Sequence, residues 1–202
     1  MSSRRSNLIL GYHGLDESIG RRIIAGEDQL LPSQNDYDWL GHGIYFWENS
    51  LVRAQKWAEK QSTNSKTSVK TPFAIGATLD LGNCLDLLDQ EWLDYIGEAY
   101  TFMIEELQAE GKEIPENTAW TSTDIDFKKR KLDCAVILYA IQMAKKEGEP
   151  FDSVRAAFWE GEDLYPNAGF KQHNHIQISI INPQCIRGLF LPRYEGWCYL
   201  NF

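Results

Sequence analysis

The chain has 202 residues, 43% hydrophobic and 24% charged, which is enough for one soluble domain with a buried core. Its formal net charge of −9 at pH 7 argues against broad nucleic-acid binding, because an acidic surface repels a phosphate backbone. No apolar run is long enough to span a membrane, and no signal-peptide run follows the basic start at Met1. We therefore expect a single cytoplasmic domain, residues 1–202, with no membrane partner.

The cysteines give no sign of a metal site. None of them forms a C-x-x-C pair, and no histidine stands at zinc-ligand spacing from them. Scattered thiols are typical of buried side chains in a reducing compartment. We expect no bound metal at the four positions Cys84, Cys134, Cys185 and Cys198.

The first part of the chain alternates apolar runs with helical and turn-forming segments. Asp16 is a favoured N-cap residue, and Ile19 and Ile23 follow it on one helical face. Leu31–Trp39 is rich in turn formers and predicts a polar loop. The expected elements are a strand at Asn7–Tyr12, a helix at Asp16–Ala25, an apolar run at Gly43–Trp47, a helix at Ser50–Gln61 and a strand at Phe73–Leu81.

The middle of the chain predicts two long helices, Glu91–Gly111 and Ile125–Lys146, because apolar residues recur there at helical spacing. The end returns to strands at Val154–Phe158, His175–Ile180 and Cys185–Leu191. Strands at both ends of a helical middle predict an α+β fold with a mainly antiparallel sheet. Residues 91–146 then form a helical insertion within the single domain.

Two short motifs carry the candidate chemistry. Tyr12-His13-Gly14 ends the first predicted strand, and Gly41-His42-Gly43-Ile44-Tyr45-Phe46 precedes a predicted helix that carries Ala54. Glycines permit close backbone approach, and a tyrosine offers a flat ring with a polar edge. Each motif alone also fits a structural role, as a satisfied histidine at a strand end or a glycine-rich turn into a core strand.

Together the two motifs resemble the poly(ADP-ribose) polymerase and diphtheria-toxin type of ADP-ribosyltransferase. The resemblance is specific over residues 8–58 and loose elsewhere, and the helical stretch 91–146 has no counterpart in it. It implies a split, mainly antiparallel sheet and NAD⁺ as co-substrate. In that family the backbone of the residue matching Gly14 holds the nicotinamide carboxamide, the residue matching His13 binds the adenosine ribose, and the residue matching Tyr45 stacks on nicotinamide. Phe46, beside Tyr45, is expected to line the same site.

The third family position, a glutamate on a late strand, differs in this chain. Alternation along His175–Ile180 places His175, Gln177 and Ser179 on one face, and Gln177 stands at the expected place. A glutamine can hold ribose hydroxyls, but it brings no negative charge and cannot act as a base. This favours single transfer or hydrolysis over chain elongation. The alternative is a polar residue on a half-exposed strand.

Three further residues are candidates for the same site. Glu160 could supply the missing carboxylate, although an acidic surface turn needs no function. Arg53 could reach a pyrophosphate, or it could be a solvated arginine on a helix face. Asn35 lies where the family places a lid over the adenosine, and it could instead form an Asx turn.

The resemblance predicts an NAD⁺-dependent mono-ADP-ribosyltransferase that releases nicotinamide. Its acceptor, a protein, a nucleic acid or a small molecule, is not identified by the sequence. One alternative is an NAD⁺ glycohydrolase acting as a toxin or defence effector. Another is a catalytically inactive module that binds NAD⁺ or ADP-ribose, for which Gln177 is the main support.

Overall fold

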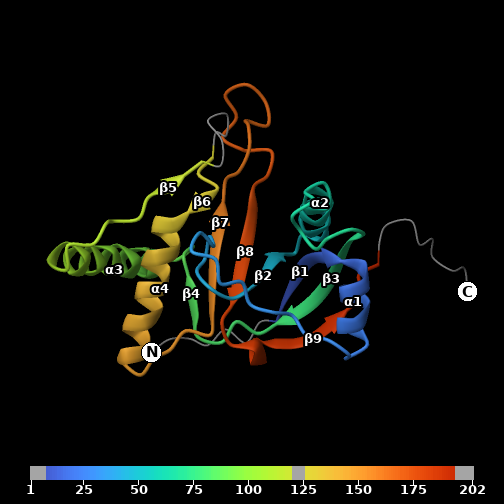
Figure 1. Cartoon of the computed structure of the whole chain (residues 1–202), viewed down its shortest axis with the longest axis horizontal. Coiled ribbons are helices and arrows are strands. Elements are labelled where there is room, and N and C mark those ends of the chain that lie inside the picture. The colour runs from blue at the N-terminus through green and yellow to red at the C-terminus, as the bar shows by residue number, and fades with distance from the viewer. Residues whose placement is uncertain (1–7, 120–125, 194–202) are drawn as a thin grey trace, which may run out of the picture.

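The computed structural model describes residues 8–119 and 126–193, and it is built around one seven-stranded sheet (Figure 1). The strand order is β4-β7-β8-β2-β1-β3-β9, and each neighbouring pair is antiparallel except β4·β7. The prediction of a mixed fold with a mainly antiparallel sheet is therefore confirmed. The strands are β1 (Ile9–Asp16), β2 (Ile44–Glu48), β3 (Pro72–Leu79), β4 (Cys84–Asp86), β7 (Ser153–Phe158), β8 (His175–Ile180) and β9 (Ile186–Phe190).

Four α-helices lie within the described ranges: α1 (Glu17–Ile24), α2 (Leu51–Ser62), α3 (Gln90–Ala109) and α4 (Lys131–Lys146). Asp16 caps α1 as expected, since its carboxylate accepts the Ser18 N–H. The same carboxylate accepts the N–H groups of Lys70 and Thr71, which fixes the helix start beside β3. The Ser18 hydroxyl, which also donates to this carboxylate, and these backbone hydrogen bonds hold the pKa of Asp16 well below its usual range.

The register of the strands divides the sheet into two faces. Tyr12 pairs with Trp47, Trp47 with Gln177 and Gln177 with Ala156, so these side chains share one face, which we call the site face. Helix α4 covers the β4–β7 end of the site face, where Ile137 packs in a cluster with Val154 and Ala156. Helix α2 covers the other end of the same face, over β1 and β3, and α1 packs on the opposite face (Figure 1).

The structure differs from the sequence expectations at several element ends. Strand β1 continues to Asp16 because it stays paired with β3 as far as Pro72. The second long helix begins at Lys131 and not at Ile125; residues 120–125 lie outside the described ranges. The region predicted as a helical insertion also contains a short antiparallel strand pair. Its strands are β5 (Asn117–Thr118) and β6 (Lys129–Arg130). Elsewhere in the chain, a 3₁₀ turn, η1 (Pro183–Cys185), precedes β9.

Within the described part of the chain, we find no helix with both the length and the apolar character needed to cross a bilayer. Cys134 and Cys185 are buried free thiols and Cys84 is half-buried, while Cys198 lies outside the described residues. Burial raises the pKa of Cys84 to about 12 and that of Cys134 and Cys185 to about 11. These three thiols are therefore protonated, poor nucleophiles at neutral pH.

Candidate functional site

The sheet opens between β1 and β2. Strand β1 pairs with β3 along its whole length but with β2 only at Gly11↔Glu48 and Tyr12↔Trp47. Asn49 N–H donates to Leu10 O at 2.8 Å, and alternate residues of an antiparallel strand direct both backbone groups to the same neighbour. The N–H and C=O of Gly14 therefore point toward β2, beyond the last residue at which the two strands pair.

His13 stands at the point where the strands part. Its Nδ1 lies 2.7 Å from Tyr45 O, the carbonyl that the Gly14 N–H would meet if the ladder continued. Because a carbonyl only accepts, Nδ1 carries the ring proton and Nε2 offers a lone pair. Burial lowers the pKa of His13, so the ring is neutral at pH 7. Gly14 thus keeps one donor and one acceptor side by side at the opening.

Glycine is required at position 14 by the helix above it. A Cβ there would lie 2.3 Å from the backbone oxygen of Ala54 and 3.1 Å from the Trp57 ring. Helix α2 therefore packs directly on the strand. Gly43 is constrained in the same way, since a Cβ would lie 2.3 Å from Ser179 Oγ on β8. Gly14 and Gly43 therefore each allow a neighbouring element to pack closely beside the opening.

Tyr45 and Phe46 have different places in the structure. The Tyr45 hydroxyl donates to Gly41 O at 2.6 Å and accepts the Leu40 N–H at 2.8 Å, and its burial raises the pKa of the phenol. Tyr45 thereby ties the preceding loop to the site face. Phe46 is completely buried on the opposite face, with its ring 5.8 Å from that of His13. The Phe46 side chain supports His13 from the core, so we assign it no direct ligand contact.

Gln177 lies on the site face among buried polar atoms that lack hydrogen-bond partners in the described residues. Trp47 Nε1, across the ladder from Gln177, is such an atom. His175 Nε2, on the same strand and face, is another, and Arg53 Nε on α2 is a third. Most buried polar groups in proteins are paired, so the two nearest Gln177 in the sheet, Trp47 Nε1 and His175 Nε2, make this part of the site face a candidate binding site. Of these, sequence reasoning placed neither Trp47 nor His175 in the site, and their two-residue spacing from Tyr45 and Gln177 on the same strands was the available signal.

Arg53 and Glu160, which the sequence proposes separately, form an ion pair. Arg53 Nη2 lies 2.8 Å from Glu160 Oε2, and the two side chains are 19% and 17% exposed. The pair joins α2 to the connection between β7 and β8. Burial and the nearby Arg53 charge lower the pKa of His175, while the Glu160 charge raises it. Arg53, Glu160 and His175 therefore belong to one electrostatic group.

Asn35 holds a turn in the loop before β2. Its Nδ2 donates to Ser33 Oγ at 2.8 Å, and its backbone N–H donates to Asp38 Oδ2 at 3.0 Å. The Asn35 side chain donates in this turn, whereas in an Asx turn its oxygen would accept a backbone N–H. Within the described chain, no Asn35 contact reaches the group around His13 or the group around Gln177.

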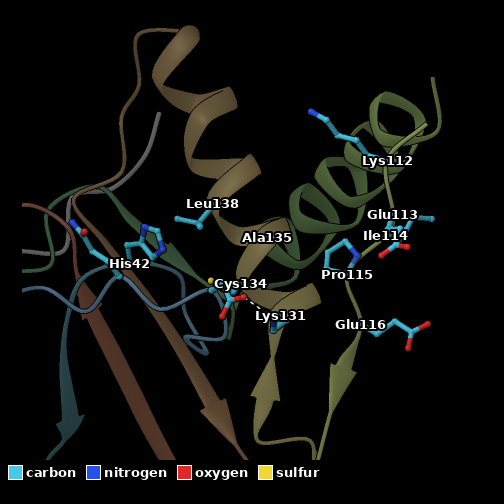
Figure 2. A pocket seen from close by; sticks show the side chains of 12 residues that line it. His42, Lys112, Glu113, Ile114, Pro115, Glu116, Lys131, Cys134, Ala135 and Leu138 are labelled. Carbon is cyan, nitrogen blue, oxygen red and sulfur yellow. Dashed lines mark ion pairs between the residues drawn. The ribbon is translucent and has the colours of Figure 1, made fainter. Parts of the chain in front are cut away.

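A cavity of about 1070 Å³ lies away from the opening, between the loop before β2, α4 and residues 112–116 (Figure 2). His42 and Leu138 border it, but His13, Gly14 and Gln177 do not. A second cavity of about 400 Å³ is lined in part by Ser50, Phe158 and His175, at the edge of the Gln177 group. The unpaired buried polar groups and the cavity of about 1070 Å³ thus lie in different parts of the molecule. We place the candidate site at the unpaired groups, beside the opening between β1 and β2, because buried polar groups are normally paired. No cluster of three potential metal ligands occurs in the described ranges.

Comparison with known proteins assigns no activity. No family model matches the chain, and no solved structure matches it significantly. The chain is similar to the uncharacterized protein MJ0359 of Methanocaldococcus jannaschii, with 41% identity over 64 residues. That match covers 32% of this chain and only 28% of the relative's length.

Proposed function

We propose that this chain binds NAD⁺ where β1 and β2 part and transfers its ADP-ribose to an acceptor. The observation that carries the proposal is the direction of the Gly14 N–H and C=O, which point toward β2 where the ladder has ended and His13 Nδ1 lies against Tyr45 O. A nicotinamide carboxamide presents one acceptor and one donor in a plane, which complements this pair. The resemblance of the two motifs to ADP-ribosyltransferases supports the same ligand and the split-sheet fold of that family.

The surrounding residues suit the rest of the ligand. The Tyr45 ring, on the same sheet face as Gln177, offers a flat surface for the nicotinamide ring. His13 Nε2, whose tautomer is fixed by the Tyr45 carbonyl, offers an acceptor to a ribose hydroxyl. Arg53 could donate to the pyrophosphate through Nε, which has no partner among the described residues, while Nη2 stays paired with Glu160.

In the proposed reaction the bond between the ribose C1″ and the nicotinamide nitrogen breaks, and its electron pair leaves with nicotinamide. The cation-like ribose is then attacked by the acceptor, which loses a proton. The Gln177 amide can hold the ribose hydroxyls in place, but it adds no negative charge opposite the cation. We therefore propose mono-ADP-ribosylation and not chain elongation. The acceptor class, protein, nucleic acid or small molecule, is open at this point.

The proposal is tested by measuring nicotinamide release from NAD⁺ together with transfer of labelled ADP-ribose. We expect His13→Ala to reduce release about tenfold or more and Gln177→Ala about 100-fold. His42→Ala and the exposed Gln184→Ala are matched controls that should retain activity. Unchanged release in both His13→Ala and Tyr45→Ala would refute the proposal.

A second candidate, a binding module that holds NAD⁺ without cleaving it, is favoured by the glutamine at position 177. Calorimetric titration separates the two. Tight NAD⁺ binding without nicotinamide release supports the module, whereas slow release that Gln177→Ala abolishes supports the enzyme. If nicotinamide is released and all of the ADP-ribose is recovered free, with none transferred, the glycohydrolase alternative is supported.

A further inference from the structure

His175 is held in one orientation and one tautomer beside Gln177. It lies two residues before Gln177 on the same face of β8, roughly 6.6 Å along the strand. Its Nδ1 lies 2.7 Å from the His173 carbonyl oxygen, so Nδ1 carries the proton and donates it there. The lone pair therefore sits on Nε2, which is buried without a hydrogen-bond partner among the described residues.

Aromatic neighbours fix the plane of the ring. The Phe158 ring is tilted 33° to it at 5.6 Å, and the Trp39 ring is stacked at 30° and 6.3 Å. The Arg130 guanidinium lies 4.2 Å from the Trp39 ring centre, on the outer side of this group. Trp39 Nε1 donates to the Lys128 carbonyl, which anchors the ring that packs on His175. These ring contacts and the Nδ1 hydrogen bond together hold Nε2 in one orientation.

The charges that face His175 come from two elements. Helix α2 contributes Arg53, and the connection between β7 and β8 contributes Glu160 and His173. Burial lowers the pKa of His175 most, Arg53 and His173 lower it further, and Glu160 together with the hydrogen bond to His173 raises it. The imidazole is neutral at pH 7 and able to accept a proton.

We propose that His175 is the general base of the transfer reaction and that the acceptor is a hydroxyl group. This inference rests on the proposed function. Gln177 cannot take a proton, and a hydroxyl needs a base because it attacks poorly while it keeps its hydrogen. The acceptor oxygen forms a bond to C1″, nicotinamide leaves with the electron pair of the broken bond, and the hydroxyl proton passes to His175 Nε2. A carboxylate or thiolate acceptor would need no such base.

The test compares nucleophiles that carry a proton with one that does not. Full-length wild type, His175→Ala and His175→Gln are incubated with NAD⁺ in water, in water with methanol, and with sodium azide. ADP-ribose, methyl ADP-ribose and ADP-ribosyl azide are separated and counted. His175→Gln keeps an N–H donor for the His173 carbonyl, and His42→Ala serves as the matched histidine control.

We expect both His175 variants to lose reaction with water and methanol about 100-fold or more, while reaction with azide stays within a few-fold of wild type. The retained azide reaction also shows that the variants are folded. The proposal is overturned if the oxygen and azide reactions fall together, if neither changes, or if wild type reacts with azide but with neither water nor methanol. That last result would leave the proposed NAD⁺ cleavage standing, whereas wild type inert to all nucleophiles would refute both.

Discussion

The candidate site has two halves that are built in different ways. The half at β1 and β2 consists of backbone groups, namely Gly14 N–H and C=O, which point toward β2 where the His13 ring contacts Tyr45 O. The half at β8 consists of side chains, Gln177, His175, Arg53 and Glu160, brought together from a strand, a helix and a connection. We expect the backbone half to be disturbed by any added side-chain atom. We expect the side-chain half to be disturbed when a charge or a proton-accepting group is removed.

The largest effect is expected where the backbone half meets α2. Gly14→Ala places a methyl group 2.3 Å from Ala54 O, so a strand or the helix has to shift. We expect a loss of about 3 kcal/mol in the free energy of unfolding, measured by urea denaturation. Gly97→Ala on α3, where an added Cβ meets nothing within 4 Å, is the control and should stabilise by about 0.5–1 kcal/mol. Equal effects of the two substitutions would contradict the close packing of α2.

A smaller effect is expected from breaking the ion pair of the side-chain half. Arg53→Met or Glu160→Gln alone should cost about 1–3 kcal/mol, because each leaves one charge of a mostly buried pair without its partner. The double variant should recover part of that loss, as measured in a double-mutant cycle. The exposed pair Arg21–Glu17 should show a coupling below about 0.5 kcal/mol. Additive costs at Arg53 and Glu160 would argue against the pair.

The smallest effect concerns the protonation of His13. Burial lowers its folded-state pKa below the ordinary 6.5, so the unfolded chain binds the proton more readily. The contribution of His13 to the free energy of unfolding is fully present above pH 6.5, and it declines as the pH falls from 6.5 toward the folded-state pKa. His13→Gln should flatten this part of a stability–pH curve. A curve unaffected by His13→Gln would contradict the neutral, buried ring.

Local patterns in the sequence predicted most helices and strands well, but they did not predict which strands pair or which distant side chains meet. Alternation identified β8 at His175–Ile180 with its observed bounds, and the capping role of Asp16 was confirmed. Strand β4 was missed, since three residues paired with a distant strand give no periodic signal. The Arg53–Glu160 contact joins residues 107 apart in sequence, which no local pattern encodes.

The candidate site shows the same division. Contiguous motifs pointed to His13, Gly14 and Tyr45, and the structure brings the His13 ring to the Tyr45 carbonyl at the strand opening. Asn35 was proposed from the lid that the family has over the adenosine, and Phe46 from its place beside Tyr45; the structure places them in a turn and in the core. Burial and cross-strand register decide whether a residue near a motif reaches the site, and both depend on the whole sheet and not on a local pattern.

The most direct measurement follows the Gly14 amide by NMR in a glycine-labelled sample titrated with nicotinamide, nicotinic acid and NAD⁺. The account predicts that nicotinamide and NAD⁺ shift the Gly14 signal and slow its hydrogen exchange. Nicotinic acid, which lacks the amide donor for the Gly14 carbonyl, should bind at least about tenfold more weakly. An unperturbed Gly14 amide, or equal binding of nicotinamide and nicotinic acid, would contradict the account.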